Sequence, residues 1–173
     1  MQGFNTSILL YGVTGSGKTH TVFGNLGYLD SSQDTEQGLV YHCFKRVMKE
    51  PSTTVSISYI EIYNEQVKDL LGSDDNLNVN ENAQGEVVIQ GLNSQQIDSF
   101  DDIIEVIRLG NMKRKVAKTC ANAFSSRSHA LLQINIRKRS DSGKIHQSKI
   151  TFVDLAGSER VELTQNKGKF QIS

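Results

Sequence analysis

The feature that most constrains this chain is a glycine-rich octapeptide that follows a short, mostly apolar run. Residues 12–19 read Gly-Val-Thr-Gly-Ser-Gly-Lys-Thr and match the pattern Gly-x-x-x-x-Gly-Lys-[Ser/Thr] in full. Residues 7–11 before it predict a buried strand, and a helix is expected from about Gly17 to Phe23. Such glycines let a loop wrap with its backbone N–H groups pointing inward, and the helix N-terminus adds its dipole. The octapeptide therefore predicts a loop that binds phosphate.

Two further segments carry a helical pattern of apolar residues. The i, i+3, i+4, i+7 stripe within residues 40–47 predicts a helix that Pro51 stops. Ser99 and Asp102 stand in capping-box positions and predict the start of another helix, with the apolar stripe Phe100, Ile103, Ile104 and Ile107. Residues 64–71 are interpreted as a short helix.

Strands are predicted where apolar side chains alternate with polar ones or form short runs. The predicted strands are residues 54–63, short strands within 76–92 around a turn at 82–85, 130–138 and 147–154. The polar loop 139–146 joins the last two in hairpin fashion, and residues 24–37 are polar and predict a loop. Strands and helices mixed in this way predict an α/β layer structure, and the hairpin predicts a mixed sheet.

Composition limits the class of protein. The 173 residues are 37% hydrophobic and 22% charged, with a formal net charge of zero, which fits a soluble globular chain that is one domain or part of a larger one. The charge balance does not predict binding to nucleic acid. The first residues lack the pattern of a signal peptide, and no apolar run is long enough to span a bilayer. We therefore expect an intracellular protein.

A second segment has the character of a magnesium-binding strand. Residues 150–154 are a predicted strand that ends in Asp154, as a Walker-B segment does. Beside the phosphate loop, Asp154 would hold Mg²⁺ through water, the Thr19 hydroxyl would bind the same ion, and Lys18 would reach the β- and γ-phosphates. Gly157, three residues later, could offer its backbone N–H to a γ-phosphate.

A third segment combines hydroxyls, a guanidinium and an imidazole. Residues 122–129 read Asn-Ala-Phe-Ser-Ser-Arg-Ser-His, directly before a predicted strand. From the residues alone, this is either a polar loop that senses phosphate and metal or a serine-rich surface loop.

These segments together resemble the kinesin motor domain. The resemblance rests on Tyr11–Thr21, on the Asn-x-x-Ser-Ser-Arg-Ser-His run at 122–129, and on Asp-Leu-Ala-Gly-Ser-Glu-Arg at 154–160. Residues 58–65, Ser-Tyr-Ile-Glu-Ile-Tyr-Asn-Glu, also resemble a strand and turn of that family. The order and spacing of the motifs fit, and the resemblance runs essentially end to end.

The resemblance implies roles for individual residues. Residues 122–129 correspond to switch I and residues 154–159 to switch II. Ser126 would lie at Mg²⁺, and Ser125 would hold the γ-phosphate and the lytic water. Arg127 would form a salt bridge with Glu159 that closes the site and supports proton removal through water, while Gly157 would sense the γ-phosphate. These four residues, Ser125, Arg127, Gly157 and Glu159, are the predicted catalytic set.

The implied cofactors are ATP and Mg²⁺. The expected Mg²⁺ ligands are Thr19, Ser126 and Asp154. His20 would lie near the adenine, or else would pack on the sheet as a residue of the first helical turn. The residues expected to contact ATP are Gly12, Val13, Thr14, Gly15, Ser16, Gly17, Lys18, Thr19, His20 and Ser126.

The implied fold is a P-loop NTPase, α/β with a mixed central sheet flanked by helices. Residues 1–173 correspond to part of a motor domain, from the P-loop strand through switch II, and the family's adenine-side segment and main track-binding helix have no counterpart. The implied activity is a microtubule-dependent ATPase in the cytoplasm and on the cytoskeleton, with tubulin as partner and no membrane span. Residues 69–97 resemble a tubulin-contacting region, whereas Lys167 and Lys169 either touch tubulin or are simply solvated. We expect the isolated chain to be weakly active and weakly stable.

Two other classes of protein compete with the motor interpretation. One is a non-motor chain that binds nucleotide or is inactive. The other is a different P-loop enzyme, such as a kinase or small GTPase. A GTPase should carry an Asn-Lys-x-Asp guanine motif, which this sequence lacks. Myosins share the architecture, but their switch sequences differ from Ser-Ser-Arg-Ser-His at 125–129.

Overall fold

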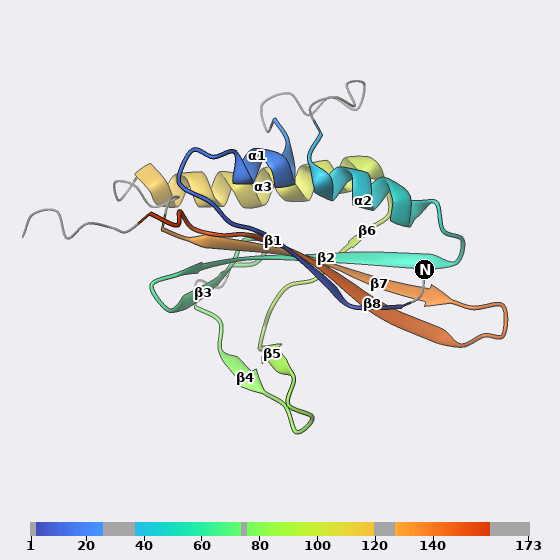
Figure 1. Ribbon diagram of the computed structural model, residues 1–173. Coiled ribbons are helices and arrows are strands. Elements are labelled where there is room, and N and C mark those ends of the chain that lie inside the picture. The colour runs from blue at the N-terminus through green and yellow to red at the C-terminus, as the bar shows by residue number, and fades with distance from the viewer. Residues whose placement is uncertain (1–2, 26–36, 74–75, 120–126, 160–173) are drawn as a thin grey trace, which may run out of the picture.

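The structure, a computed structural model, describes residues 3–25, 37–73, 76–119 and 127–159 (Figure 1). Strands and helices are mixed along the chain, as the sequence predicts. The elements are β1 (Thr6–Leu10), α1 (Lys18–Phe23), α2 (Leu39–Met48), β2 (Thr53–Tyr63), β3 (Gln66–Asp69), β4 (Val79–Glu81), β5 (Val87–Ile89), β6 (Gln95–Ile97), α3 (Phe100–Thr119), β7 (His129–Arg139) and β8 (Ile145–Asp154).

The central sheet has the strand order β1-β8-β7-β2-β3, with β6 also paired to β2. β1 runs parallel to β8, and the other pairs in this sheet are antiparallel. The β7–β8 hairpin extends from the pair Ala130 and Asp154 to the pair Arg139 and Ile145. The predicted mixed sheet and its hairpin are therefore confirmed.

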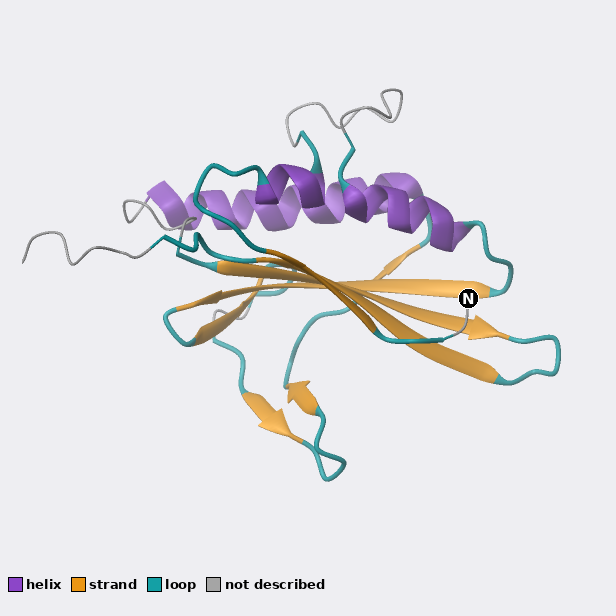
Figure 2. Cartoon of the chain, viewed as in Figure 1, coloured by secondary structure: helices purple, strands orange, loops and turns teal. Residues whose placement is uncertain are grey.

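The helices α1, α2 and α3 cover one face of the sheet (Figure 2). The predicted stripe on α2 is buried at Val40, Phe44 and Val47, and Cys43 is half-buried beside it. These side chains form one hydrophobic core with the residues of α3 and of the sheet face beneath, namely Ile103, Val106, Ile107, Ile57, Tyr59, Leu132, Ile134 and Phe152. Burial of this continuous apolar surface is what holds the helices to the sheet.

The start of α3 is fixed by the predicted capping box. The Ser99 N–H donates to Asp102 Oδ2 at 2.8 Å, and the Asp102 N–H donates to Ser99 Oγ at 3.2 Å. This reciprocal pair satisfies two backbone donors that the first helical turn leaves free. The capping prediction is confirmed.

The helix predicted for residues 64–71 is wrong. Asn64 and Glu65 have positive φ angles of 49° and 63°, which form the tight turn of a hairpin. The chain then returns as β3, and Val67 pairs with Ile62 of β2. Long-range pairing with β2 decides the conformation of this segment, and a local pattern of a few residues does not report it.

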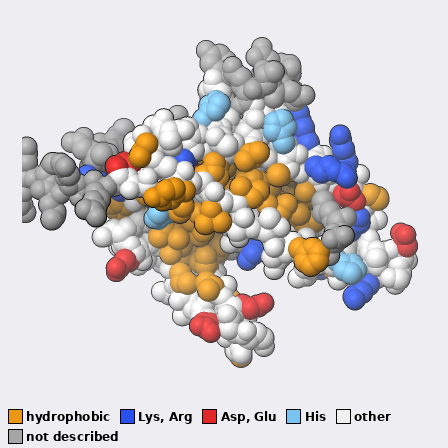
Figure 3. Space-filling view, in the orientation of Figure 1, with side chains coloured by type: hydrophobic (Ala, Val, Ile, Leu, Met, Phe, Trp, Pro, Cys, Tyr) orange, Lys and Arg blue, Asp and Glu red, His pale blue; other side chains and the backbone are white. Residues whose placement is uncertain are grey.

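The face of the sheet away from the helices carries a smaller apolar cluster and the β4–β5 hairpin. Ile60, Val67 and Leu77 are buried there. Figure 3 shows hydrophobic side chains gathered across the middle of the molecule and down toward this hairpin, where Val79 and Val87 are exposed. None of the described helices is long and apolar enough to cross a membrane.

Candidate functional site

The phosphate-loop sequence lies between β1 and α1, at the end of β1 that adjoins the end of β8. Leu10, the last residue of β1, pairs with Asp154, the last residue of β8. Gly15 and Gly17 have φ angles of +81° and +90°, which side chains with a Cβ rarely adopt. The parallel pairing therefore places the loop and the strand-end acid at the same edge of the sheet, where ligands bind in open α/β folds.

Lys18 lies across the base of this loop. Its Nζ donates to the carbonyl oxygens of Gly12 at 2.8 Å and Val13 at 3.0 Å. Two carbonyl contacts hold the ammonium group at the loop, and its positive charge favours an anion there.

Thr19 and Asp154 are in direct contact beside the phosphate loop. The Thr19 hydroxyl donates to Asp154 Oδ2 at 2.7 Å. Asp154 is buried, and its other oxygen, Oδ1, has no hydrogen-bond partner among the described residues. Hydroxyl and carboxylate oxygens are the ligands that Mg²⁺ prefers, so a buried carboxylate oxygen with spare capacity beside Thr19 fits a bound Mg²⁺.

Residues 157–159 lie against the phosphate loop. Ser158 N–H donates to the Gly12 carbonyl at 3.1 Å. Glu159 accepts the backbone N–H of Thr14 at 2.9 Å and also accepts its hydroxyl. A Cβ on Gly157 would collide with the Thr14 hydroxyl and the Glu159 carboxylate. The segment after β8 therefore reaches the phosphate loop, and a larger residue at position 157 would displace these side-chain contacts.

The same contacts set the charge of Glu159. Hydrogen bonds from Thr14 and the nearby Lys18 ammonium hold the pKa of Glu159 below its ordinary value. Its carboxylate thus stays ionised at neutral pH while it contacts a backbone N–H of the loop.

A buried ionic cluster beneath the site was not predicted from the sequence. Arg114 of α3 places Nη1 3.6 Å from Asp154 Oδ2 and Nε 3.4 Å from Glu61 Oε1. Ser128, the residue before β7, donates to Glu61 Oε1 at 2.7 Å. One feature of the sequence could have indicated this cluster. Arg114 follows Ile103, Ile107 and Gly110 at helical spacing, which places a charged residue on the buried stripe of α3.

Burial shapes the ionisation of this cluster. Burial disfavours the charged form of Arg114, but Tyr59 and the two acids outweigh this effect and raise the pKa of the guanidinium above its ordinary value. Burial also raises the pKa of Tyr59 to about 12, and the Tyr59 hydroxyl donates to Asn111 Oδ1 at 3.0 Å. The arginine is therefore a permanent cation beside the two carboxyl groups.

The remaining predicted residues are placed as follows. Arg127 is exposed, and the ion pairs of the described residues do not include one between Arg127 and Glu159. His20 is exposed on α1. His129 Nδ1 accepts the N–H of Ala156 at 3.0 Å, so the end of the Ser-Ser-Arg-Ser-His motif contacts the segment after β8. Ser125 and Ser126, like Lys167 and Lys169, lie outside the described residues.

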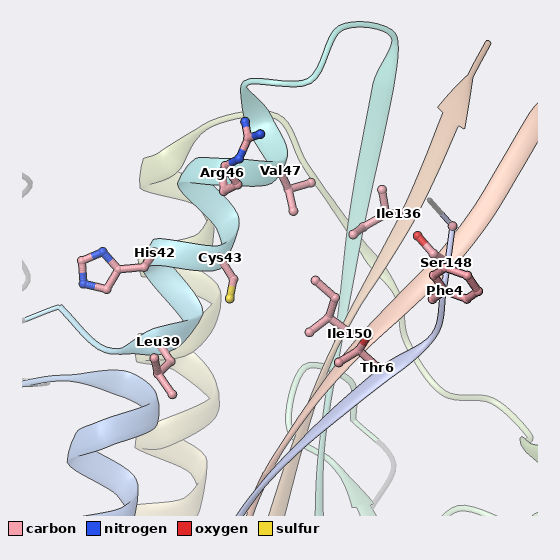
Figure 4. A pocket seen from close by; sticks show the side chains of 11 residues that line it. Phe4, Thr6, Leu39, His42, Cys43, Arg46, Val47, Ile136, Ser148 and Ile150 are labelled. Atoms are coloured by element: carbon pink, nitrogen blue, oxygen red, sulfur yellow. The ribbon is translucent and has the colours of Figure 1, made fainter. Parts of the chain in front are cut away.

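An apolar pocket of about 540 Å³ lies elsewhere, between α2 and the strands β1, β7 and β8 (Figure 4). Phe4, Leu39, Cys43, Val47, Ile136 and Ile150 are among the side chains that line it. No residue of the phosphate loop contributes to the lining, so this pocket is separate from the site described above.

Comparison with known proteins places this geometry in a family. The chain matches the kinesin motor domain over residues 1–172. It is 37% identical to the mouse (Mus musculus) kinesin-like protein KIF18A over 97% of this chain and 19% of that protein. It is 34% identical to kinesin-like protein 6 of Schizosaccharomyces pombe over 98% of this chain and 24% of that protein.

A solved structure of a fast kinesin has the same fold. It superposes with a TM-score of 0.85 at 33% sequence identity, over 97% of this chain and 49% of that chain. This chain thus spans about a fifth of the curated relatives named above and about half of the solved chain. The motif order, the strand order around the phosphate loop and the match over residues 1–172 show that this chain belongs to the kinesin motor domain family.

Proposed function

We propose that this chain is the phosphate-binding part of a microtubule-dependent motor ATPase. The observation that carries the proposal is the hydrogen bond between Thr19 and Asp154, which brings together the phosphate loop and the strand-end acid. A P-loop NTPase needs this pair of groups at one place to bind a nucleoside triphosphate with its metal.

In this proposal, the phosphate loop and Lys18 bind the β- and γ-phosphates of ATP, and His20 lies on the adenine side. Thr19 and Asp154, together with Ser126, would hold Mg²⁺, which neutralises phosphate charge when bound. The buried Asp154 Oδ1 that has no partner among the described residues supports this assignment.

Switch II supplies the response to the γ-phosphate. Gly157 offers its backbone N–H to that phosphate, while Ser125 orients the attacking water. Arg127 and Glu159 close the site through a salt bridge. Glu159 contacts Thr14 in the structure and forms no ion pair with Arg127 there. Forming that bridge therefore requires either the Arg127 side chain or residues 157–159 to move. Such a loop, released when the γ-phosphate leaves, is the usual switch of nucleotide-driven proteins.

The partner of the motor is the microtubule, and its location is the cytoplasmic cytoskeleton. Family membership supports this assignment, and the β4–β5 hairpin lies within the region 69–97 that resembles a tubulin-contacting segment. The surfaces that this assignment involves lie on the side of the sheet away from α1, α2 and α3.

The test has two stages. In the first, the protein in the full-length context of this sequence is titrated with a fluorescent ATP analogue, with and without Mg²⁺, beside a Lys18→Ala variant. We expect binding that Mg²⁺ strengthens and that Lys18→Ala weakens by roughly tenfold or more, as loss of a charge-assisted contact does. A chain that binds no nucleotide in either condition contradicts the proposal.

In the second stage, phosphate release is measured in the full-length context of this sequence, with and without microtubules. We expect microtubules to accelerate release. Nucleotide binding without any stimulation would instead favour a non-motor nucleotide-binding protein.

A further inference from the structure

Three residues in adjacent strands form a row beneath α3. Glu61 of β2 pairs with Ala130 of β7, and Ala130 pairs with Asp154 of β8. Residues that pair directly across a sheet point to the same face, so the two acids flank the small side chain of Ala130. All three residues are buried, with exposed fractions of 3%, 1% and 3%.

Arg114 bridges the two acids that flank Ala130. It is 5% exposed, and its guanidinium reaches Glu61 with Nε at 3.4 Å and Asp154 with Nη1 at 3.6 Å. A guanidinium presents several donors in a fixed plane and can serve two carboxylates at once, whereas a lysine ammonium is a single point charge. The methyl group of Ala130 leaves the room that this bridge needs.

Each of the two acids is also bonded to a different segment of the site. Asp154 accepts the hydroxyl of Thr19, the second residue of α1. Glu61 accepts the hydroxyl of Ser128, which directly follows Arg127 and precedes β7. The arginine is therefore the one described cation that contacts both acids, and through them it connects the start of β7 to the phosphate loop.

We propose that Arg114 is a positioning residue that fixes Asp154 for metal-dependent nucleotide binding and couples Ser128 to it through Glu61. The inference rests on the proposed function, since it concerns the same phosphate loop. Arg114 touches neither phosphate nor water in this role. It acts by holding the Asp154 carboxylate in one orientation, with one oxygen toward Thr19.

The experiment compares Arg114→Lys and Arg114→Met with Arg108→Met. Arg108 lies on the same helix, but its ion pair with Glu105 is exposed, so its variant controls for loss of an arginine on α3. For each protein, thermal unfolding is recorded first, and affinity for a fluorescent ATP analogue is then measured in Mg²⁺ and in EDTA. The ratio of the two affinities reports the metal-dependent contribution alone.

We expect Arg114→Lys to remain folded and to reduce this ratio about tenfold, with affinity in EDTA nearly unchanged. Arg108→Met should leave the ratio at its wild-type value. A folded Arg114→Lys with the wild-type ratio, or an equal loss of affinity in Mg²⁺ and in EDTA, overturns the inference. If the wild-type protein itself binds no nucleotide in either condition, the proposed function fails. That result can be told apart from the two outcomes that overturn only the role of Arg114.

Two further variants keep the test informative if Arg114→Met does not fold. Ala130→Val keeps arginine at position 114 but adds volume between the two acids, where the guanidinium bridges them. We expect this variant to lower the same ratio of affinities in Mg²⁺ and EDTA. Ser128→Ala should lower the ratio in wild type and have no further effect in Arg114→Lys, because the coupling passes through the arginine. Additive effects of Ser128→Ala and Arg114→Lys would overturn the coupling.

Discussion

The hydroxyl of Thr19 donates a 2.7 Å hydrogen bond to Asp154 Oδ2, and this contact joins the first turn of α1 to the end of β8. The two residues are far apart in sequence, and the parallel pairing of β1 with β8 brings them together. Thr19 is exposed, so its substitution should affect metal binding rather than the fold, whereas Asp154 is also the buried partner of Arg114.

For this reason we predict that Thr19→Val weakens nucleotide binding in Mg²⁺ by roughly tenfold, since a hydrogen bond to a charged group is worth about 1.5–3 kcal/mol. Binding in EDTA should change little, because the loop backbone is intact. Thr19→Ser keeps the hydroxyl and serves as the matched control. Titration with a fluorescent analogue in both conditions checks the prediction, and equal weakening in EDTA would contradict it.

Glu159→Ala should separate binding from hydrolysis. The carboxylate accepts the Thr14 backbone N–H, so its removal frees a donor of the phosphate loop and should leave ATP affinity intact or improved. Hydrolysis should fall by a factor of about a hundred or more if Glu159 supports proton removal, as is typical of acid–base groups.

The measurement for Glu159 is single-turnover phosphate release in the full-length context. Glu105→Ala is the control, because Glu105 makes an exposed ion pair with Arg108 on α3. Unchanged turnover in Glu159→Ala would refute the role assigned to this residue.

The capping box at the start of α3 predicts a pH-dependent stability. Backbone hydrogen bonds from Asp98 and Ser99 hold the pKa of Asp102 below its ordinary value. A carboxyl with a lowered folded-state pKa stabilises the fold above its unfolded pKa, near about 4, and loses that effect as pH falls through the folded value. Asp102→Asn should thus be less stable than wild type at pH 7, and the difference should shrink in acid.

Urea unfolding between pH 7 and about pH 2 checks this expectation. Ser99→Ala should cost about 1 kcal/mol at neutral pH through loss of the other half of the box. Asp101→Asn, in the same first turn, removes a charge without removing these cap bonds and serves as the control. A difference in unfolding free energy between Asp102→Asn and wild type that stays constant in acid would contradict the stabilising role of the ionised Asp102.

Gly110 lies on α3 against the ring of Tyr59, and a Cβ there would overlap ring atoms. Helix propensity alone predicts that Gly110→Ala raises the free energy of unfolding by about 1 kcal/mol. The collision with a fully buried ring should outweigh this gain, because overpacking in a core costs about 1–3 kcal/mol. We expect a net loss of unfolding free energy, measured by urea denaturation. Met112→Ala, at an exposed position on the same helix, should change it little, and a stabilised Gly110→Ala would contradict this account.

Much of the fold follows from local patterns in the sequence. The stripe of α2, the capping box of α3 and the alternation in β2 and β7 all report which face of each element is buried. The β7–β8 hairpin was predicted from its polar loop, and this antiparallel pair together with the parallel β1–β8 pair makes the sheet mixed. These features could be predicted because the periodicity of a long element is set by burial of one face.

Other features depend on contacts that no local pattern reports. Residues 66–69 form a strand because β2 lies beside them, and the turn at Asn64 and Glu65 requires positive φ angles that neither residue type demands. The position of Arg114 was visible in the helical stripe, but its two carboxylate partners come from strands distant in sequence. The phosphate loop was recognised from its pattern, whereas the pairing of Arg127 with Glu159 stays a prediction.

The parallel pairing of β1 with β8 also has a mechanical consequence. A load applied between the start of β1 and the end of β8 would strain the hydrogen bonds along all five residues of β1 together, in shear. The antiparallel β7–β8 ladder, loaded between Ala130 and Asp154, would open pair by pair from one end. The strand that carries the phosphate loop is thus held by the geometry that better withstands force along its axis, while its neighbour can be unzipped.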